Sequence, residues 1–236
     1  MKNVKISLII PTYNEERYIK NCLISTVTQT RKPDEIIIVD NNSSDKTISI
    51  AKQFPVRIVQ EKKQGMIQAR NRGFDEAKGD IIARCDADVH LMPHWIDRIK
   101  HDFEENEIDA LTGPFIFYDL KLKTTFFTTA YLDIFKPILN GNEVLVGPNM
   151  AITKKMWKKV KPYVCLDNKK VHEDIDLAIH INDLGGHIMR DDELIVQVSG
   201  RRIRKNPMSF FGEYPLRFIK TLARHKKDII TPFLAQ

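Results

Sequence analysis

Short apolar runs alternate with amphipathic stretches along the first 84 residues. Four runs have the length and β-branched content of buried strands: Val4–Ile10, Glu35–Val39, Val56–Val59 and Asp80–Arg84. Three stretches between them are predicted helices: Glu15–Thr28, a segment capped by Ser43 or Ser44 that runs to about Gln53, and Gly65–Lys78, closed by Gly79. Strands that alternate with helices predict βαβ units, and therefore a mostly parallel, Rossmann-like α/β sheet flanked by helices.

The pattern after residue 88 is less regular. Helices are predicted at Pro93–Glu105, Thr124–Leu139, Lys154–Val160 and from His172 to Gly185. Strands are predicted at Ala110–Tyr118, Val144–Ile152, His187–Arg190 and Leu194–Val198, and Gly-Pro pairs interrupt the first two. No change of composition marks a linker, so we expect one domain over residues 1–200 and a basic extension over residues 201–236.

The composition is that of a globular protein, because 42% of the 236 residues are hydrophobic and 29% are charged. No apolar run approaches the roughly 20 residues of a membrane-spanning helix, so a soluble, cytoplasmic protein is expected. The three cysteines, Cys22, Cys85 and Cys165, are too few and too far apart to predict a disulfide framework or a zinc site.

The net charge of +6 arises near the C-terminus, where residues 200–228 contain nine lysines and arginines but two acids. This distribution argues against nucleic-acid binding and favours a local anionic partner. Arg201 and Arg202 follow the last predicted strand and could fold over a site to meet phosphate. Pro215–Lys227 is predicted as an amphipathic helix, which either packs on its own domain, as we favour, or lies on an anionic membrane surface near a lipid-linked acceptor.

Acidic residues follow two of the predicted parallel strands, at the edge of the sheet where such folds bind ligands. Asp86 and Asp88 follow the fourth strand, and a Mg²⁺ or Mn²⁺ ion shared with phosphate oxygens would explain the pair. The alternative is a loop with two solvated acids. Asp40 ends the second strand, where it would accept hydrogen bonds from a base or ribose, or simply form an Asx-turn.

Two further motifs carry charge at helical positions. Arg70 would clamp a diphosphate with two hydrogen bonds, or would be an ordinary surface arginine. Glu173 and Asp174 begin a helix, where acids are favoured by the helix dipole, and where a carboxylate would also serve as a general base. The sequence contains neither G-x-G-x-x-G nor G-x-x-x-x-G-K-[ST], which excludes the usual dinucleotide and P-loop modes of binding.

Taken together and in this order, the motifs resemble those of the family 2 glycosyltransferases of the GT-A fold. The resemblance spans about residues 4 to 200 and rests on Pro11-Thr-Tyr-Asn-Glu, Asp40, Ala69-Arg-Asn, Asp86-Ala-Asp, Gly147-Pro-Asn-Met and Glu173-Asp-Ile-Asp-Leu. It implies transfer of a sugar from a nucleotide-diphosphate sugar to a carbohydrate or lipid-linked acceptor hydroxyl. The transfer would invert the anomeric carbon and would use Mg²⁺ or Mn²⁺.

The resemblance also implies roles for individual residues. The nucleoside site would be lined by Pro11, Tyr13, Glu15 and Asp40, with Arg70 facing the diphosphate. Asp86 would contact the ribose or metal, Asp88 would hold the metal, and Gly147 and Asn149 would shape the donor sugar pocket. Asp174 would be the base, with Glu173 reaching the acceptor or sugar.

The sequence departs from related enzymes at two points. The late histidine that many GT-A enzymes add to the metal site is missing near Val198-Ser-Gly. The Q-x-x-R-W signature of processive synthases is also missing, so we expect transfer of single sugars in the synthesis of cell-envelope polysaccharide or glycolipid. One alternative is a nucleotidyltransferase, although such an enzyme would be expected to have a glycine-rich loop after the first strand. Another is a non-catalytic protein that binds nucleotide sugars.

Overall fold

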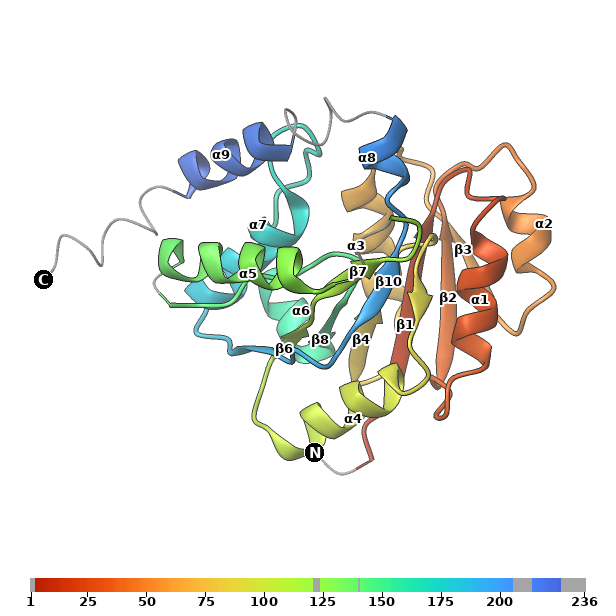
Figure 1. The fold of residues 1–236 in the computed structure, drawn as a ribbon, viewed down its shortest axis with the longest axis horizontal. Helices are drawn as coiled ribbons and strands as arrows, with labels where there is room; N and C mark the ends of the chain where they lie inside the picture. The colour runs from red at the N-terminus through yellow and green to blue at the C-terminus, as the bar shows by residue number, and fades with distance from the viewer. Residues whose placement is uncertain (1–2, 121–123, 140, 206–213, 226–236) are drawn as a thin grey trace, which may run out of the picture.

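A seven-stranded sheet forms the centre of the molecule, with helices on both of its faces (Figure 1). The computed structural model describes residues 3–120, 124–139, 141–205 and 214–225. The four N-terminal strands are β1 (Ile6–Thr12), β2 (Glu35–Asp40), β3 (Arg57–Gln60) and β4 (Ile81–Arg84). They pair in parallel in the order β3-β2-β1-β4, which confirms the predicted α/β class.

The second half of the sheet is mixed. β8 (Met150–Thr153) is antiparallel to both β4 and β6 (Ala110–Thr112), and β6 pairs in parallel with the edge strand β9 (Ile188–Arg190). The strand predicted at Ala110–Tyr118 with a break at Gly113-Pro114 forms two strands, β6 and β7 (Phe115–Phe117). β7 belongs to a separate three-stranded sheet with β10 (Val196–Val198) and β5 (His90–Leu91), which the sequence pattern did not predict.

Alternation along β1 separates two apolar layers. Ile6, Leu8 and Ile10 pack with α1 (Ile19–Val27), α2 (Thr47–Ala51) and α4 (Trp95–Glu105), whereas Ile9 points to the opposite face. That face is covered by α3 (Met66–Glu76), α6 (Lys154–Val160) and α7 (Glu173–Asp183). α3 lies very close to the sheet, because a Cβ on its Gly73 would fall 2.2 Å from Ile9 Cγ2.

Two predicted helix ends were wrong in detail. α2 begins at Thr47, whose backbone N–H donates to Asp45 Oδ1 at 2.9 Å, while the backbone N–H of Ser43 donates to Asp40. α3 ends at Glu76, and Gly79 has no positive φ. Gly79 instead allows close approach to β1, because an added Cβ would lie 2.7 Å from the carbonyl oxygen of Lys5.

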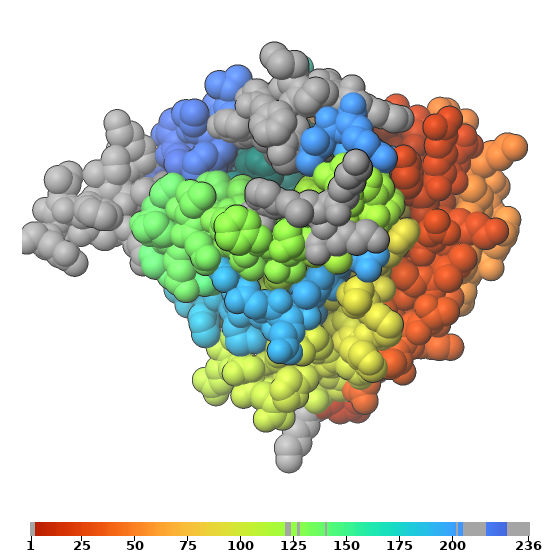
Figure 2. All heavy atoms as spheres, viewed as in Figure 1, coloured from red at the N-terminus to blue at the C-terminus, as the bar shows by residue number. Residues whose placement is uncertain are grey.

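Three helices complete the described chain: α5 (Phe126–Ile138), α8 (Arg201–Lys205) and α9 (Tyr214–Arg224). α9 packs beside α5, as the neighbouring blue and green atoms show (Figure 2), and the ring centres of Phe218 and Phe135 are 4.4 Å apart. Leu216 and Ile219 remain more than half exposed. No helix within the described ranges is both long and apolar enough to cross a membrane. The domain boundary expected at residue 200 stays a prediction.

Candidate functional site

A pocket of about 180 Å³ lies at the carboxyl ends of the parallel strands. It is lined by Pro11, Thr12, Tyr13, Glu15, Asn41, Gln64, Gly65, Met66, Ala69, Asp86, Ala87, Asp88 and Arg201. Six of the site residues predicted from sequence thus come together, from the end of β1 and the segment after it, from the segment after β4, and from α8. A larger hollow of about 480 Å³ lies between α5 and β9, and none of the predicted site residues lines it.

Asp86 and Asp88 lie in a turn beyond β4 rather than on an extended strand, since the backbone N–H of Val89 donates to the Asp86 carbonyl at 3.1 Å. Each carboxylate is paired with its own arginine. Asp86 Oδ1 lies 3.1 Å from Arg84 Nη2, and Asp88 Oδ2 lies 3.0 Å from Arg201 Nε. These two guanidinium groups offset the repulsion between acids that are only two positions apart.

Arg201 reaches the pocket from α8 and joins it to the first strand-helix connection. Its two terminal nitrogens lie 2.6 and 2.5 Å from the Glu15 carboxylate, and the guanidinium stacks 4.4 Å from the Tyr18 ring centre. Burial alone would lower the pKa of Arg201, but the Glu15 and Asp88 carboxylates outweigh it and raise that pKa. In Figure 2 the blue atoms of α8 accordingly lie beside the red N-terminal segment. The side chain of Arg202 lies outside the described part of the structure.

The loop after β2 contributes Asn41, which the sequence analysis missed. Asn41 Nδ2 donates to the carbonyls of Glu61 and Lys63, both at 2.9 Å, and Asn41 Oδ1 accepts from the N–H of Gly65 at 2.7 Å. It therefore holds the segment that leads into α3 against the pocket. Asp40, the predicted residue, accepts from the backbone N–H of Ser43, three residues on rather than the two of an Asx-turn, and does not line the pocket. In the sequence, the polar run that follows a buried strand could have indicated Asn41 as a site residue.

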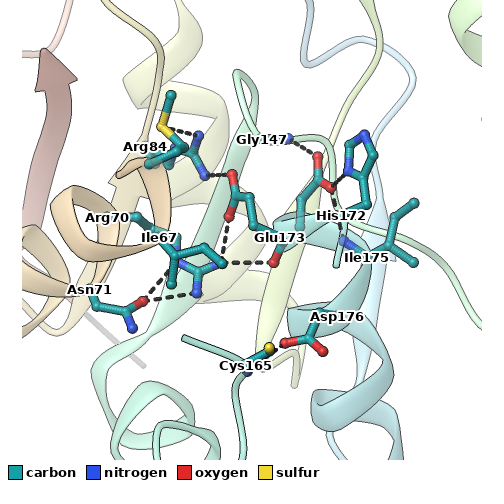
Figure 3. A network of polar contacts seen from close by, with 12 residues as sticks. Ile67, Arg70, Asn71, Arg84, Gly147, Cys165, His172, Glu173, Ile175 and Asp176 are labelled. Atoms are coloured by element: carbon teal, nitrogen blue, oxygen red, sulfur yellow. Dashed lines mark hydrogen bonds and ion pairs between the residues drawn. The ribbon is translucent and has the colours of Figure 1, made fainter. Parts of the chain in front are cut away.

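Behind the pocket, four side chains form a ladder of alternating charge, most of which Figure 3 shows. Asp86 pairs with Arg84, Arg84 Nη1 lies 2.5 Å from Glu173 Oε1, and Glu173 Oε2 lies 2.5 Å from Arg70 Nη1. Arg84 and Arg70 are 2% and 0% exposed, so these pairs replace the water that would otherwise solvate them. We define Asp86, Arg84, Glu173 and Arg70 as the charge ladder.

The charge ladder changes the expectation for Arg70. That residue does not line the pocket and is not a surface arginine; its guanidinium donates to Glu173 and to Asn71 Oδ1. Burial lowers the pKa of Arg70 despite the opposing Glu173 charge. Arg84 was missed as a functional residue, although a charged residue that ends a buried apolar run is the signal that could have identified it. Burial would lower the pKa of Arg84, but the negative charges of Glu173 and Asp86 outweigh that effect and raise the pKa.

Asp174 follows Glu173 at the start of α7, where it is 8% exposed. Asp174 Oδ2 accepts from the backbone N–H of Gly147 at 2.9 Å, and Asp174 Oδ1 lies 2.5 Å from His172 Nδ1 (Figure 3). Burial would raise the pKa of Asp174, but the His172 charge, these hydrogen bonds and Arg84 hold it well below its usual range. Burial likewise would lower the pKa of His172, and Asp174 raises it instead. Sequence reasoning missed His172.

Asn149, expected to shape a sugar pocket, is instead fully buried between the two sheets. Asn149 Nδ2 donates to the carbonyls of Pro114 and Leu194, and Asn149 Oδ1 accepts from Trp95 Nε1 at 2.8 Å. The side-chain amide of Asn149 thereby provides hydrogen bonds to backbone carbonyls where the two sheets diverge. Gly147, two residues earlier, does lie at the site, because a Cβ there would fall 3.3 Å from both Arg84 Nη2 and Asp174 Oδ2.

Two sets of side chains in the described ranges have the chemistry to hold a metal. Asp86 and Asp88 offer carboxylate oxygens at the pocket, a donor set that fits a hard divalent cation such as Mn²⁺ or Mg²⁺. Asp176, His180 and His225 form a separate cluster whose ligand atoms lie within 4.8 Å of one another.

The comparisons with known proteins point to one family. A family model described as glycosyl transferase family 2 matches residues 7–165. Glycosyltransferase AglE of Haloferax volcanii is 33% identical over 116 residues, which is 46% of this chain and 38% of that protein. The chain spans 24% to 41% of the length of the first four curated relatives that it matches.

Solved structures share the fold at low sequence identity. Mannosyltransferase PcManGT from Pyrobaculum calidifontis, in complex with GDP-Man and Mn²⁺, aligns with a TM-score of 0.77 and 17% identity over 98% of this chain and 68% of that one. Glucosyl-3-phosphoglycerate synthase from Mycobacterium tuberculosis, in complex with Mn²⁺, UDP and glucosyl-3-phosphoglycerate, aligns with a TM-score of 0.70 and 18% identity over 94% and 80% of the two chains. The expected GT-A fold is thereby confirmed.

Removing the shared carboxylate of the charge ladder should destabilise the protein. We expect Glu173→Gln to lower the free energy of unfolding by about 3 kcal/mol or more, because both buried guanidinium groups lose their common counter-charge. The matched control is Glu76→Gln, which breaks the partly exposed pairs with Arg57 and Arg72 and should cost less than about 1 kcal/mol. Urea denaturation measures both, and equal losses would show that the ladder is no more important than a surface pair.

Proposed function

This chain belongs to glycosyl transferase family 2, and on that premise we propose that it transfers one sugar from a nucleotide-diphosphate sugar to an acceptor hydroxyl, inverting the anomeric carbon. The observation that carries the proposal is the strand-end pocket, in which Asp86 and Asp88 lie beside an arginine from α8. Further support comes from the two neighbours above, which bind a nucleotide or nucleotide sugar together with Mn²⁺.

The donor nucleoside would occupy the part of the pocket formed after β1 and β2. Tyr13 is 51% exposed there, so its ring is available to stack on a base, and Pro11 and Glu15 line the same wall. Asn41 holds the opposite wall through Gly65. Asp40 precedes Asn41 in the chain, and its Oδ1 already accepts from Ser43, so Asp40 would accept a hydrogen bond from the nucleoside through its other oxygen.

Asp88 and Asp86 would hold Mn²⁺ or Mg²⁺ at this pocket. When bound, the cation would offset the negative charge that develops on the departing diphosphate. Arg201 Nε now pairs with Asp88 Oδ2, so a cation that binds this oxygen has to displace the guanidinium. Once released, the Arg201 guanidinium would hold the diphosphate. A similar role for Arg202, the next residue in the sequence, stays a prediction. Arg70 would act indirectly, by holding Glu173 in place.

Asp174 would remove the proton of the attacking hydroxyl. The Gly147 backbone N–H fixes one of its oxygens and His172 contacts the other, so the carboxylate has one orientation. Glu173 would reach acceptor or sugar only by leaving its two arginines, so we assign it the role of anchoring the start of α7 beside the pocket. The acceptor, and any association of α9 with an anionic membrane, stay predictions.

The metal role of Asp88 is tested by thermal stability with and without ligand. We expect Mn²⁺ together with the matching nucleotide diphosphate to raise the melting temperature of the wild type, because both bind the folded state. Asp88→Ala should lose the metal-dependent part of that rise. Glu105→Ala, an exposed acid on α4, is the control and should keep it. An undiminished rise in Asp88→Ala would exclude Asp88 as a ligand.

The contact between Arg201 and Asp88 predicts competition with the cation. Without donor, Arg201→Gln should bind Mn²⁺ at least several-fold more tightly than the wild type, because the positive charge of Arg201 no longer competes with the cation for Asp88 Oδ2. Arg204→Gln, a more exposed arginine on the same helix, should have no such effect. Isothermal titration calorimetry measures the affinities, and equal values in the wild type and Arg201→Gln would contradict the competition.

The pair of His172 and Asp174 predicts a pH dependence. His172 has a pKa raised above the ordinary value of about 6.5, and its positive charge keeps Asp174 weakly basic. As pH rises through the His172 pKa, that charge is lost, Asp174 becomes the stronger base, and the transfer rate should increase. In His172→Gln this rise should vanish from the pH profile.

The role of Asp174 as the base is tested with Asp174→Asn. It should still bind donor, as judged by the ligand-dependent rise in melting temperature, but its transfer rate should fall by roughly 100-fold or more. Full turnover by Asp174→Asn would refute the assigned base. Donor binding with no transfer by the wild type to any acceptor would instead favour a non-catalytic nucleotide-sugar-binding protein.

A further inference from the structure

Three side chains with metal-ligating atoms meet between α7 and the end of α9. Asp176 and His180 are one turn apart on α7, and His225 immediately follows α9. We propose that Asp176, His180 and His225 form a binding site for Zn²⁺ or a similar first-row transition-metal ion, and that the ion fastens α9 to α7. Asp176 lies two residues after Asp174, a spacing that directs the two side chains to different sides of the helix. The proposal does not depend on the transferase activity.

The distances between the ligand atoms suit one ion. Asp176 Oδ1 lies 3.0 Å from His225 Nε2 and 3.8 Å from His180 Nε2. Ligands of a tetrahedral Zn²⁺, each about 2.05 Å from the ion, are roughly 3.4 Å apart, and the two measured distances bracket that value. The two imidazole rings are steeply inclined, at 75° with centres 4.7 Å apart, so their nitrogens converge on the carboxylate from different directions.

The surroundings orient the carboxylate as a metal ligand. Asp176 Oδ2 accepts from the backbone N–H of Cys165 at 2.9 Å, which directs Oδ1 toward the imidazoles. Asp176 and His225 are 1% and 3% exposed, so a cation here would be bound with little competition from water. The side chain of His180 is 16% exposed, but its Nε2 atom is buried, so this ligand atom is shielded from water as well.

The donor set favours one class of metal. Two imidazoles and one carboxylate suit Zn²⁺, Co²⁺ or Ni²⁺, whereas Mg²⁺ and Ca²⁺ prefer oxygen ligands alone. This cluster is therefore chemically distinct from the carboxylate pair at the pocket. The alternative is a metal-free pair in which His225 only donates a hydrogen bond to Asp176.

An ion at this position would strengthen the contact between α9 and the domain. Apart from the contacts of His225 itself, α9 is held by the backbone N–H of His172, which donates to Thr221 Oγ1 at 2.7 Å, and by the ring contact of Phe218 with Phe135. Metal affinity that depends on ligands from two helices contributes directly to the stability of their docked arrangement.

The full chain, freed of metal with a chelator, tests the proposal by calorimetric titration with Zn²⁺ and by the visible absorption of added Co²⁺. We expect the wild type and Asp88→Ala each to bind one Zn²⁺ per chain, because the acids of the pocket are not ligands at this site. His225→Gln can still donate a hydrogen bond to Asp176 but is a poor ligand, and it should weaken Zn²⁺ binding at least tenfold. His101→Ala, an exposed histidine on α4, is the matched control and should bind as the wild type does.

Hydrogen exchange of the α9 amides provides the second measurement. Zn²⁺ should slow exchange in α9 of the wild type but not of His225→Gln, whose exchange without metal should match that of the metal-free wild type. The proposal is overturned if the wild type binds no Zn²⁺, if His225→Gln binds it equally well, or if Asp88→Ala abolishes binding. Zn²⁺ binding that leaves α9 exchange unchanged overturns the fastening role.

Discussion

Burial of two arginines is the constraint on which the site depends. Arg70 and Arg84 come from α3 and β4, both are almost completely buried, and an unpaired guanidinium in that position would cost several kcal/mol. Glu173 provides the counter-charge to both, so the first residue of α7 has to lie where the two guanidinium groups meet. Asp174 follows Glu173 directly, and its position relative to the sheet is set by the same pairing. A contact that looks purely structural thereby positions the proposed base.

The same alternation of charge extends to the surface of the pocket. Arg84 also pairs with Asp86, and Arg201 pairs with Asp88 and Glu15, so the acids at the strand ends are neutralised before any ligand binds. In a donor complex, the pair of Arg201 and Asp88 would be replaced by two others. A divalent cation would bind the carboxylates, and the guanidinium would bind the diphosphate. Each charged group keeps a partner of opposite charge in this exchange, so its free-energy cost is lower than that of leaving a charged group unpaired in a partly buried site. In that exchange the Arg201 guanidinium would leave Asp88 Oδ2.

The two proposed cation sites differ in chemistry. The pocket would offer carboxylates to a hard ion, and the cluster of Asp176, His180 and His225 would offer two imidazoles and a carboxylate to a borderline ion that holds α9. Glu173, Asp174 and Asp176 all lie in the first turn of α7, and His180 lies in its last turn. Docking of the C-terminal helix and orientation of the proposed base thus involve one rigid element.

The sequence alone determined the features that depend on local patterns. Apolar runs identified the four parallel strands, and the acids after β4 and at the start of α7 carried the resemblance to the family. Only the tertiary structure decided which charges pair, because the partners are distant in sequence: Arg70 and Glu173 are 103 residues apart, and Arg201 and Glu15 are 186 apart. It also placed Asn149 between two sheets, the second of which has strands of only two or three residues, too short to give a period. Burial and long-range pairing depend on how elements approach one another, and no local pattern of residues records that.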